Sequence, residues 1–134
     1  MTSAFPTNAV DQLLQSLAKG DVLATDCPSR AILQHLTNKW GTLVMLALFS
    51  GTLRFSDLRR RIGGVSERML AQTLQQLEAD GMLRRVAHNV VPPHVDYSLT
   101  DIGAEGAGHV ANLVCWIETS LPRIMANARR AEQA

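Results

Sequence analysis

An arginine and two glutamines follow a double glycine at the spacing of one helical face. They are Arg68, Gln72 and Gln75, and the glycines are Gly63-Gly64. Arginine can donate two hydrogen bonds to guanine, and glutamine can pair twice with adenine, in the major groove of DNA. The chemistry that this segment could perform is therefore recognition of bases, rather than bond making or breaking.

The other side of the same segment is apolar. Leu70, Leu74 and Leu77 repeat at intervals of four and three, which indicates a buried helical stripe. Ser66 is a good N-cap, and an acidic residue in the first turn is favoured by the helix dipole. We predict a recognition helix from Ser66 to Asp80. Its free side, here called the recognition face, comprises Glu67, Arg68, Ala71, Gln72 and Gln75, with Gln76 as a weaker candidate.

Residues near the N-terminus of a recognition helix usually lie deepest in the groove, so Arg68 and Gln72 are the expected base contacts. Other polar side chains suit the DNA backbone. The expected phosphate contacts are Ser66, Thr73, Arg59, Arg84, Arg85 and His88, with His94 as a weaker candidate. The run Arg59-Arg60-Arg61 fits solvation and phosphate contact equally, because three consecutive helical residues cannot face one direction.

Cys27 is the candidate for thiol chemistry. It precedes Pro28-Ser29 at the predicted start of a helix, where the helix dipole favours a thiolate. The neighbouring carboxylate of Asp26 has the opposite effect, and Arg30 is the closest basic residue in the sequence. A redox-sensing thiol and a small, half-buried cysteine without a signalling role are both consistent with this pattern.

Catalysis by Cys27 would require a base within reach. His35 lies two turns further along the same predicted helix and is poorly placed. His88, His94 and His109 show no metal-ligand spacing with carboxylates, and the sequence has no glycine-rich phosphate loop. We therefore expect no enzyme, no metal and no cofactor.

The elements that would position these residues follow from periodicity and from start and stop signals. The predicted helices are Asp11 to Lys19, one from Cys27-Pro28 with Ile32, Leu33 and Leu36 on its apolar face, one from Asn38 or Lys39 to Ser50-Gly51, Phe55 to Ile62, the recognition helix, and Asp101 to Ala126. Two strands, Leu83 to Ala87 and Val95 to Leu99, follow the recognition helix. Pro122 is expected to kink or restart the last helix.

A short helix, a glycine turn, a longer helix and a hairpin form the winged helix-turn-helix plan. The predicted fold class is mainly α with a small β-hairpin wing. One domain, 1–134, would contain a DNA-binding core at about 25–100 and dimerisation helices at 7–20 and 101–128.

Composition supports this prediction. The chain of 134 residues is 46% hydrophobic with a formal net charge of +1, but the segment from Arg54 to Arg85 carries +3. The longest apolar run, Leu43 to Phe49, is too short for a membrane span, and no secretory signal is evident. Two cysteines do not suffice for a disulfide framework or a zinc cluster. A cytoplasmic location is the default expectation.

The ordered set of motifs resembles the HxlR family of bacterial transcription regulators, a branch of the MarR-like winged-helix group. The resemblance covers roughly residues 25 to 118. It rests on Cys27-Pro28, Lys39-Trp40, Phe55-Ser56-Asp57-Leu58-Arg59, Ile62-Gly63-Gly64-Val65-Ser66, Met69-Leu70, Leu74 to Gly81, Pro92-Pro93, Val95, Tyr97-Ser98-Leu99-Thr100 and Gly103.

The resemblance implies a transcription regulator, expected to be a repressor, that reads an inverted repeat of double-stranded DNA as a homodimer. The N- and C-terminal helices would form the dimer interface. Many members of this family sense oxidants or electrophiles, such as quinones, through a cysteine at the position of Cys27. Cys115 lies among Leu113, Val114 and Trp116 and is expected to serve core or interface packing.

Two alternatives stay open at this point. The regulator could respond to a small molecule rather than to thiol chemistry, with Trp40, Met45, Phe49 and Trp116 lining the effector pocket; core packing explains these residues equally well. A protein–protein adaptor that uses the winged domain without DNA is the second alternative, and the arginine-rich segment argues against it.

Overall fold

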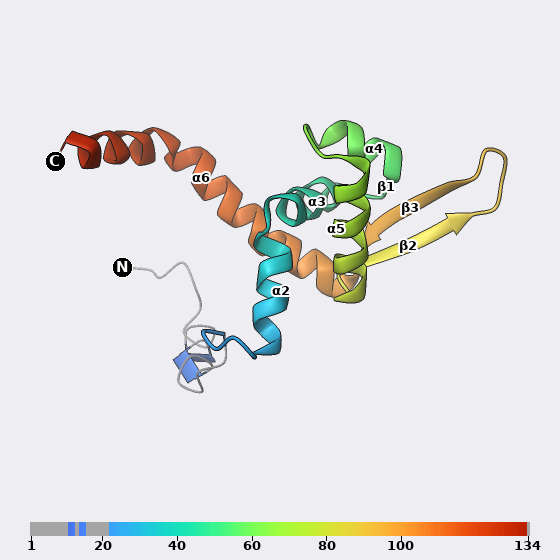
Figure 1. The fold of residues 1–134 in the computed structure, drawn as a ribbon, viewed down its shortest axis with the longest axis horizontal. Helices are drawn as coiled ribbons and strands as arrows, with labels where there is room; N and C mark the ends of the chain where they lie inside the picture. Colours follow the sequence, from blue (N-terminus) through green and yellow to red (C-terminus); the bar gives the residue numbers. More distant parts are fainter. Residues whose placement is uncertain (1–10, 13, 16–21, 134) are drawn as a thin grey trace.

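The computed structural model describes residues 11–12, 14–15 and 22–133. The elements in chain order are α2 (Pro28–Thr37), α3 (Lys39–Phe49), β1 (Leu53–Arg54), α4 (Phe55–Arg61), α5 (Glu67–Ala79), β2 (Leu83–His88), β3 (His94–Leu99) and α6 (Asp101–Gln133). The described chain is mainly helical with a small antiparallel sheet, as predicted (Figure 1). No helix among these residues is both long and apolar enough to cross a membrane.

Helix α3 occupies the centre of the core. Its sequence is apolar on nearly every side, which suits a helix enclosed by others. Its own Val44, Met45 and Leu48 are buried. The buried side chains around them come from α4, α5, the sheet and α6: Leu58, Leu70, Leu74, Leu77, Leu83, Tyr97 and Ala107. The helix-turn-helix pair and the wing are thus fixed to one common core.

Side-chain caps set where three of the helices begin. The Ser66 hydroxyl accepts a hydrogen bond from the Met69 N–H at 3.1 Å, and the Asn38 side chain accepts one from the Trp40 N–H at 3.1 Å. The Thr100 hydroxyl accepts from the Gly103 N–H at 3.0 Å. Each cap satisfies an amide that has no partner within its own helix. The predicted starts of α3, α5 and α6 are confirmed.

The sheet has the order β1-β3-β2, and all its pairs are antiparallel. The hairpin of β2 and β3 confirms the predicted wing, which projects from the helical body in Figure 1. Strand β1 is an addition to the prediction. Its two residues pair with the free edge of β3, with Leu53 opposite Tyr97 and Arg54 opposite Asp96.

Helix α6 is longer than predicted. It continues through Pro122 and ends at Gln133, so its 33 residues extend for about 50 Å. Figure 1 shows its first part crossing the body and its last part projecting beyond it in a changed direction, which is the effect expected of an internal proline. Most of the predicted helix at 7–20 lies outside the described residues, although Asp11, Gln12, Leu14 and Gln15 are helical.

Candidate nucleic-acid interface

The turn between α4 and α5 holds the two helices in a fixed relation. Ile62 and Val65, at its two ends, are buried in the core. Between them Gly64 has a φ of +85°, in the left-handed region that a residue with a side chain rarely adopts. Two anchors flanking a glycine hinge therefore set the angle at which α5 leaves α4.

Helix α5 has the two distinct sides that its sequence predicted. Leu70, Leu74 and Leu77 are buried against the core. Arg68 and Gln72 are exposed, and so are Gln75 and Gln76. The helix thus presents a polar row of guanidinium and carboxamide groups to solvent over a length of about 12 Å.

Of the two hydroxyl residues predicted to contact phosphate, the structure exposes one. Ser66 is exposed, and because its oxygen accepts the Met69 N–H, its own O–H stays available as a donor. Thr73 is only 6% exposed, which contradicts a phosphate contact. At 100° per residue Thr73 lies only about 40° around the helix from Leu77, so the helical period could have revealed its burial.

Basic side chains surround the start of α5. Arg59 lies 3.9 Å from the carboxylate of Glu67, and both are exposed. Arg60 pairs with Asp57 on its own helix, and the guanidinium of Arg61 donates to the Ser50 hydroxyl at 3.4 Å. The three arginines thus make separate contacts. Exposed ion pairs contribute little free energy, so the pair with Glu67 holds Arg59 only weakly. The Arg59 side chain can therefore turn toward a phosphate.

A hollow of about 400 Å³ lies where α4 and α5 come together. It is lined by Phe55, Ser56, Arg59, Arg60 and Glu67. Two guanidinium groups at one hollow suit an anion such as a DNA phosphate, which would have to displace the Glu67 carboxylate from Arg59.

The wing separates its two arginines. Side chains alternate along a strand, so Arg84 and His88 share the outer face of the sheet while Arg85 is on the face of the buried Tyr97, its cross-strand partner. Both arginines are exposed. The two arginines therefore extend from opposite faces of the wing, and the phosphate contact expected of each stays a prediction.

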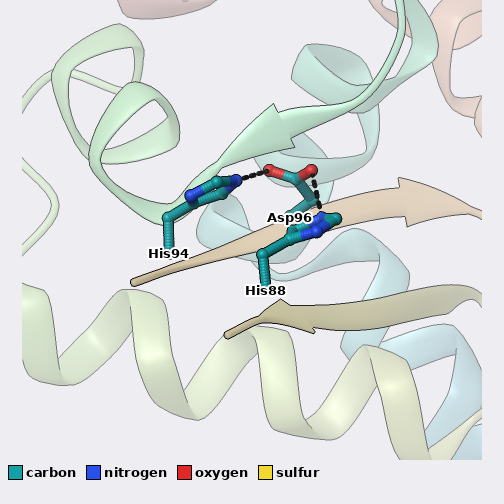
Figure 2. Close-up of side chains that lie close together, drawn as sticks. All are labelled: His88, His94 and Asp96. Carbon is teal, nitrogen blue, oxygen red and sulfur yellow. Dashed lines mark hydrogen bonds and ion pairs between the residues drawn. The ribbon is translucent and has the colours of Figure 1, made fainter. Parts of the chain in front are cut away.

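The structure also forms a cluster that the sequence reading missed. His88, His94 and Asp96 meet on the outer face of the wing, and we call them the wing cluster (Figure 2). Nε2 of His88 lies 2.8 Å from Oδ2 of Asp96, and Nε2 of His94 lies 3.9 Å from Oδ1. The prediction that these histidines have no ligand-like arrangement with a carboxylate is wrong. His88 contacts Asp96 while its side chain remains 39% exposed, so its phosphate contact stays a prediction.

Cys27 occupies the N-cap position of α2 and is partly buried. Its sulfur lies 2.9 Å from the Ser29 hydroxyl, and Arg30 donates to the Leu23 carbonyl at 2.9 Å instead of approaching the thiol. His35, in the last turn of α2, contacts Asp80. Cys115 is exposed, so the core-packing role considered for it is wrong within one subunit.

The four residues expected to line an effector pocket lie in different environments. Met45 is wholly buried in the core, while Phe49 and Trp116 are each more than half exposed. Lys39 extends its ammonium group over the Trp40 ring, 4.3 Å from the centroid. An apolar groove of about 280 Å³ lies elsewhere, between α2 and α6, lined by Leu33, Leu36, Thr37, Gly106, His109, Val110 and Leu113. We call it the α2–α6 groove.

Comparison with known proteins agrees with this geometry. The chain matches the HxlR-like helix-turn-helix family over residues 35–125. It is 57% identical over 114 residues to the HTH-type transcriptional regulator YtfH of Escherichia coli (strain K12), covering 85% of this chain and 90% of the relative.

Solved structures give the same result. The transcriptional regulator YtfH from Salmonella typhimurium aligns with a TM-score of 0.78 at 55% identity, covering 81% of this chain and 97% of that one. The redox regulator HypR in its reduced form aligns with a TM-score of 0.68 at 31% identity, covering 74% and 98%. This chain therefore belongs to the HxlR-like helix-turn-helix family and is a transcriptional regulator with a winged helix-turn-helix fold.

Proposed function

We propose that the protein binds an inverted-repeat operator in double-stranded DNA as a homodimer and represses transcription. We also propose that it is located in the cytoplasm. In this proposal α5 enters the major groove, with Arg68 and Gln72 contacting bases and Gln75 supporting them. Ser66, Arg59 and one arginine of the wing contact the sugar–phosphate backbone. Repression follows where the operator overlaps a promoter.

One observation carries the proposal. The leucines of α5 are buried while Arg68, Gln72 and Gln75 on its opposite side are exposed. Exposed guanidinium and carboxamide groups on one side of a rigid helix match the donor and acceptor pattern of base edges in the major groove. The adaptor alternative gives no reason for that row.

The homodimer is supported by apolar surface that one subunit leaves uncovered. From Leu113 onward, α6 exposes the large side chains Leu113, Trp116, Ile117, Leu121, Ile124 and Met125. Helix α2 has no buried residue, and its Ile32 and Leu33 are also exposed. The α2–α6 groove joins the two helices. Monomeric proteins rarely leave continuous apolar surface of this kind, and a second copy would cover it.

A thiol switch at Cys27 is the proposed signal. The cysteine is partly buried at the start of α2, and a hydroxyl lies within hydrogen-bonding distance of its sulfur. The similarity to HypR, which is described as a redox regulator, supports the proposal. Because α2 also contributes to the α2–α6 groove, oxidation of its N-cap residue would act at the proposed subunit contact. A small molecule in that groove is the competing signal.

Gel-shift titration of the DNA upstream of the protein's own gene tests operator binding. We expect a complex with two subunits per site, half-sites about one helical turn apart, and an affinity that falls steeply between 50 and 200 mM salt, by about a thousandfold for six phosphate contacts. An adaptor would leave this DNA unshifted at both salt concentrations, and that result would reject the proposal.

A further inference from the structure

The wing cluster consists of ligand types that transition metals prefer. It supplies two imidazoles and one carboxylate, a set that suits Zn²⁺ and its neighbours in the first transition row. Mg²⁺ and Ca²⁺ prefer oxygen atoms alone. One donor atom from each of the three residues lies within 4.8 Å of the others.

The hairpin register explains why these residues meet. His88 and His94 are direct cross-strand partners, and Asp96 lies two residues beyond His94 on the same face of β3. The imidazole rings stack with centroids 4.6 Å apart. In Figure 2 both rings point toward the Asp96 carboxylate, which lies between their Nε2 atoms. The backbone thus brings the three ligands to one side of the sheet.

We propose that His88, His94 and Asp96 form a binding site for a divalent transition-metal ion of the zinc class in the wing. Metal–ligand bonds of about 2.0–2.2 Å at tetrahedral angles would set neighbouring donor atoms about 3.3 Å apart. The distance from His88 to Asp96 is 2.8 Å and that from His94 to Asp96 is 3.9 Å. These two contacts go to different oxygens of Asp96, and the three donor atoms lie within 4.8 Å of one another, so the side chains would have to rotate to place one donor atom from each residue around the ion. Solvent would supply the fourth ligand.

The hydrogen bonds already assign part of the proton arrangement. Nδ1 of His94 lies 3.4 Å from the Pro92 carbonyl, which can only accept, so this nitrogen carries the proton. Nε2 then presents its lone pair toward the cluster, as a metal ligand must. Nε2 of His88 lies 2.8 Å from Oδ2 of Asp96, and an ion bound between them would replace this hydrogen bond with two metal–ligand bonds.

The surroundings make the site accessible and modest in affinity. The side chains of His88, His94 and Asp96 are 39%, 22% and 27% exposed. Arg54 lies opposite Asp96 across the sheet, and Arg84 is on the same face as His88. The two guanidinium groups would repel a bound metal ion, but solvent and salt screen this repulsion. An ion would change the local charge by +2 and cross-link β2 to β3 at the exposed end of the wing.

Isothermal titration calorimetry with ZnCl₂ tests the proposal. The experiment uses the full chain without a histidine tag. We expect one Zn²⁺ per chain, with affinity reduced at least about tenfold by His94→Gln and by Asp96→Asn. The matched control His109→Gln removes an exposed imidazole from α6, and Cys27→Ser and Cys115→Ser remove the thiols; all three should keep the wild-type affinity.

Circular dichroism of each variant shows whether its fold is intact. His88→Gln provides a second ligand deletion if one of the others fails to fold. Absence of a stoichiometric Zn²⁺ site, or loss of Zn²⁺ affinity only in His109→Gln or the cysteine variants, would overturn the proposal. The titration contains no DNA, so its result is independent of operator binding.

Discussion

Nδ1 of His35 lies 2.6 Å from Oδ2 of Asp80, joining the last turn of α2 to the C-cap of α5. Both side chains are largely shielded from solvent. Cys27 is the N-cap of α2, and α5 carries the proposed base contacts. The thiol-bearing helix and the recognition helix are thus in direct polar contact, and the histidine considered as a catalytic base for Cys27 has this structural partner instead.

His35→Ala is expected to lower the free energy of unfolding by about 1–3 kcal/mol, because it leaves the Asp80 carboxylate without its partner at a helix end whose dipole disfavours an anion. Urea denaturation measures the effect, and a double-mutant cycle with Asp80→Ala isolates the pair. Arg60→Ala, which breaks an exposed ion pair, should change stability by less than about 1 kcal/mol. A coupling energy of zero would contradict the importance of the His35–Asp80 contact.

Gly103→Ala should destabilise the protein, because a Cβ there would lie 2.0 Å from the Met82 carbonyl oxygen. That contact docks the start of α6 beside the wing, and we expect a cost of about 1–3 kcal/mol. Gly108→Ala is the matched control on the same helix. Its Cβ would meet nothing within 4 Å, so the better helix former should raise thermal stability slightly. Equal melting temperatures for the two variants would show that the close approach is unimportant.

Trp116→Glu should weaken the proposed dimer by more than about a hundredfold, equivalent to about 2.7 kcal/mol, since it places a charge within the apolar face of α6. Sedimentation equilibrium measures the dissociation constant. Val91→Glu makes the same kind of change at the wing, where Val91 is 98% exposed, and should leave the dimer intact. A Trp116→Glu protein that dimerises like wild type would place the interface elsewhere.

Cys27→Ser tests the thiol switch. Diamide should reduce the operator affinity of the wild-type protein at least about tenfold, or about 1.4 kcal/mol, and a reductant should restore it. The serine variant should bind the operator equally well with and without diamide, whereas Cys115→Ser should respond like wild type. Release of Cys27→Ser by diamide to the same extent would remove this thiol from the mechanism, and a groove-bound effector would then be the better hypothesis.

Local signals were sufficient to predict the elements that carry the recognition face. The caps at Ser66 and Thr100 and the leucine repeat of α5 act within one or two turns of helix, so the sequence displays them directly. Strand β1 has no such signal. Leu53 and Arg54 are too few to show alternation, and they become a strand only because β3 offers them a free edge.

The remaining differences also have physical causes. The wing cluster depends on the cross-strand register of His88 with His94, which spacing along the chain does not reveal. Helix α6 changes direction as expected of a helix with an internal proline, but it continues to Gln133, beyond the predicted end at Ala126, because one proline removes a single backbone hydrogen bond from a long helix. Thr73 has a polar side chain, but its position around α5 places it beside the leucine stripe.

The central claim is that the exposed face of α5 reads base sequence, and Arg68→Ala tests it most directly. Affinities are measured for the operator and for every single-base variant of one half-site. We expect a loss of about 1–3 kcal/mol and relaxed preference at one base pair, while Arg129→Ala, which removes an exposed arginine near the end of α6, keeps the wild-type profile. An Arg68→Ala protein with unchanged affinity and unchanged preference at every position would contradict the claim.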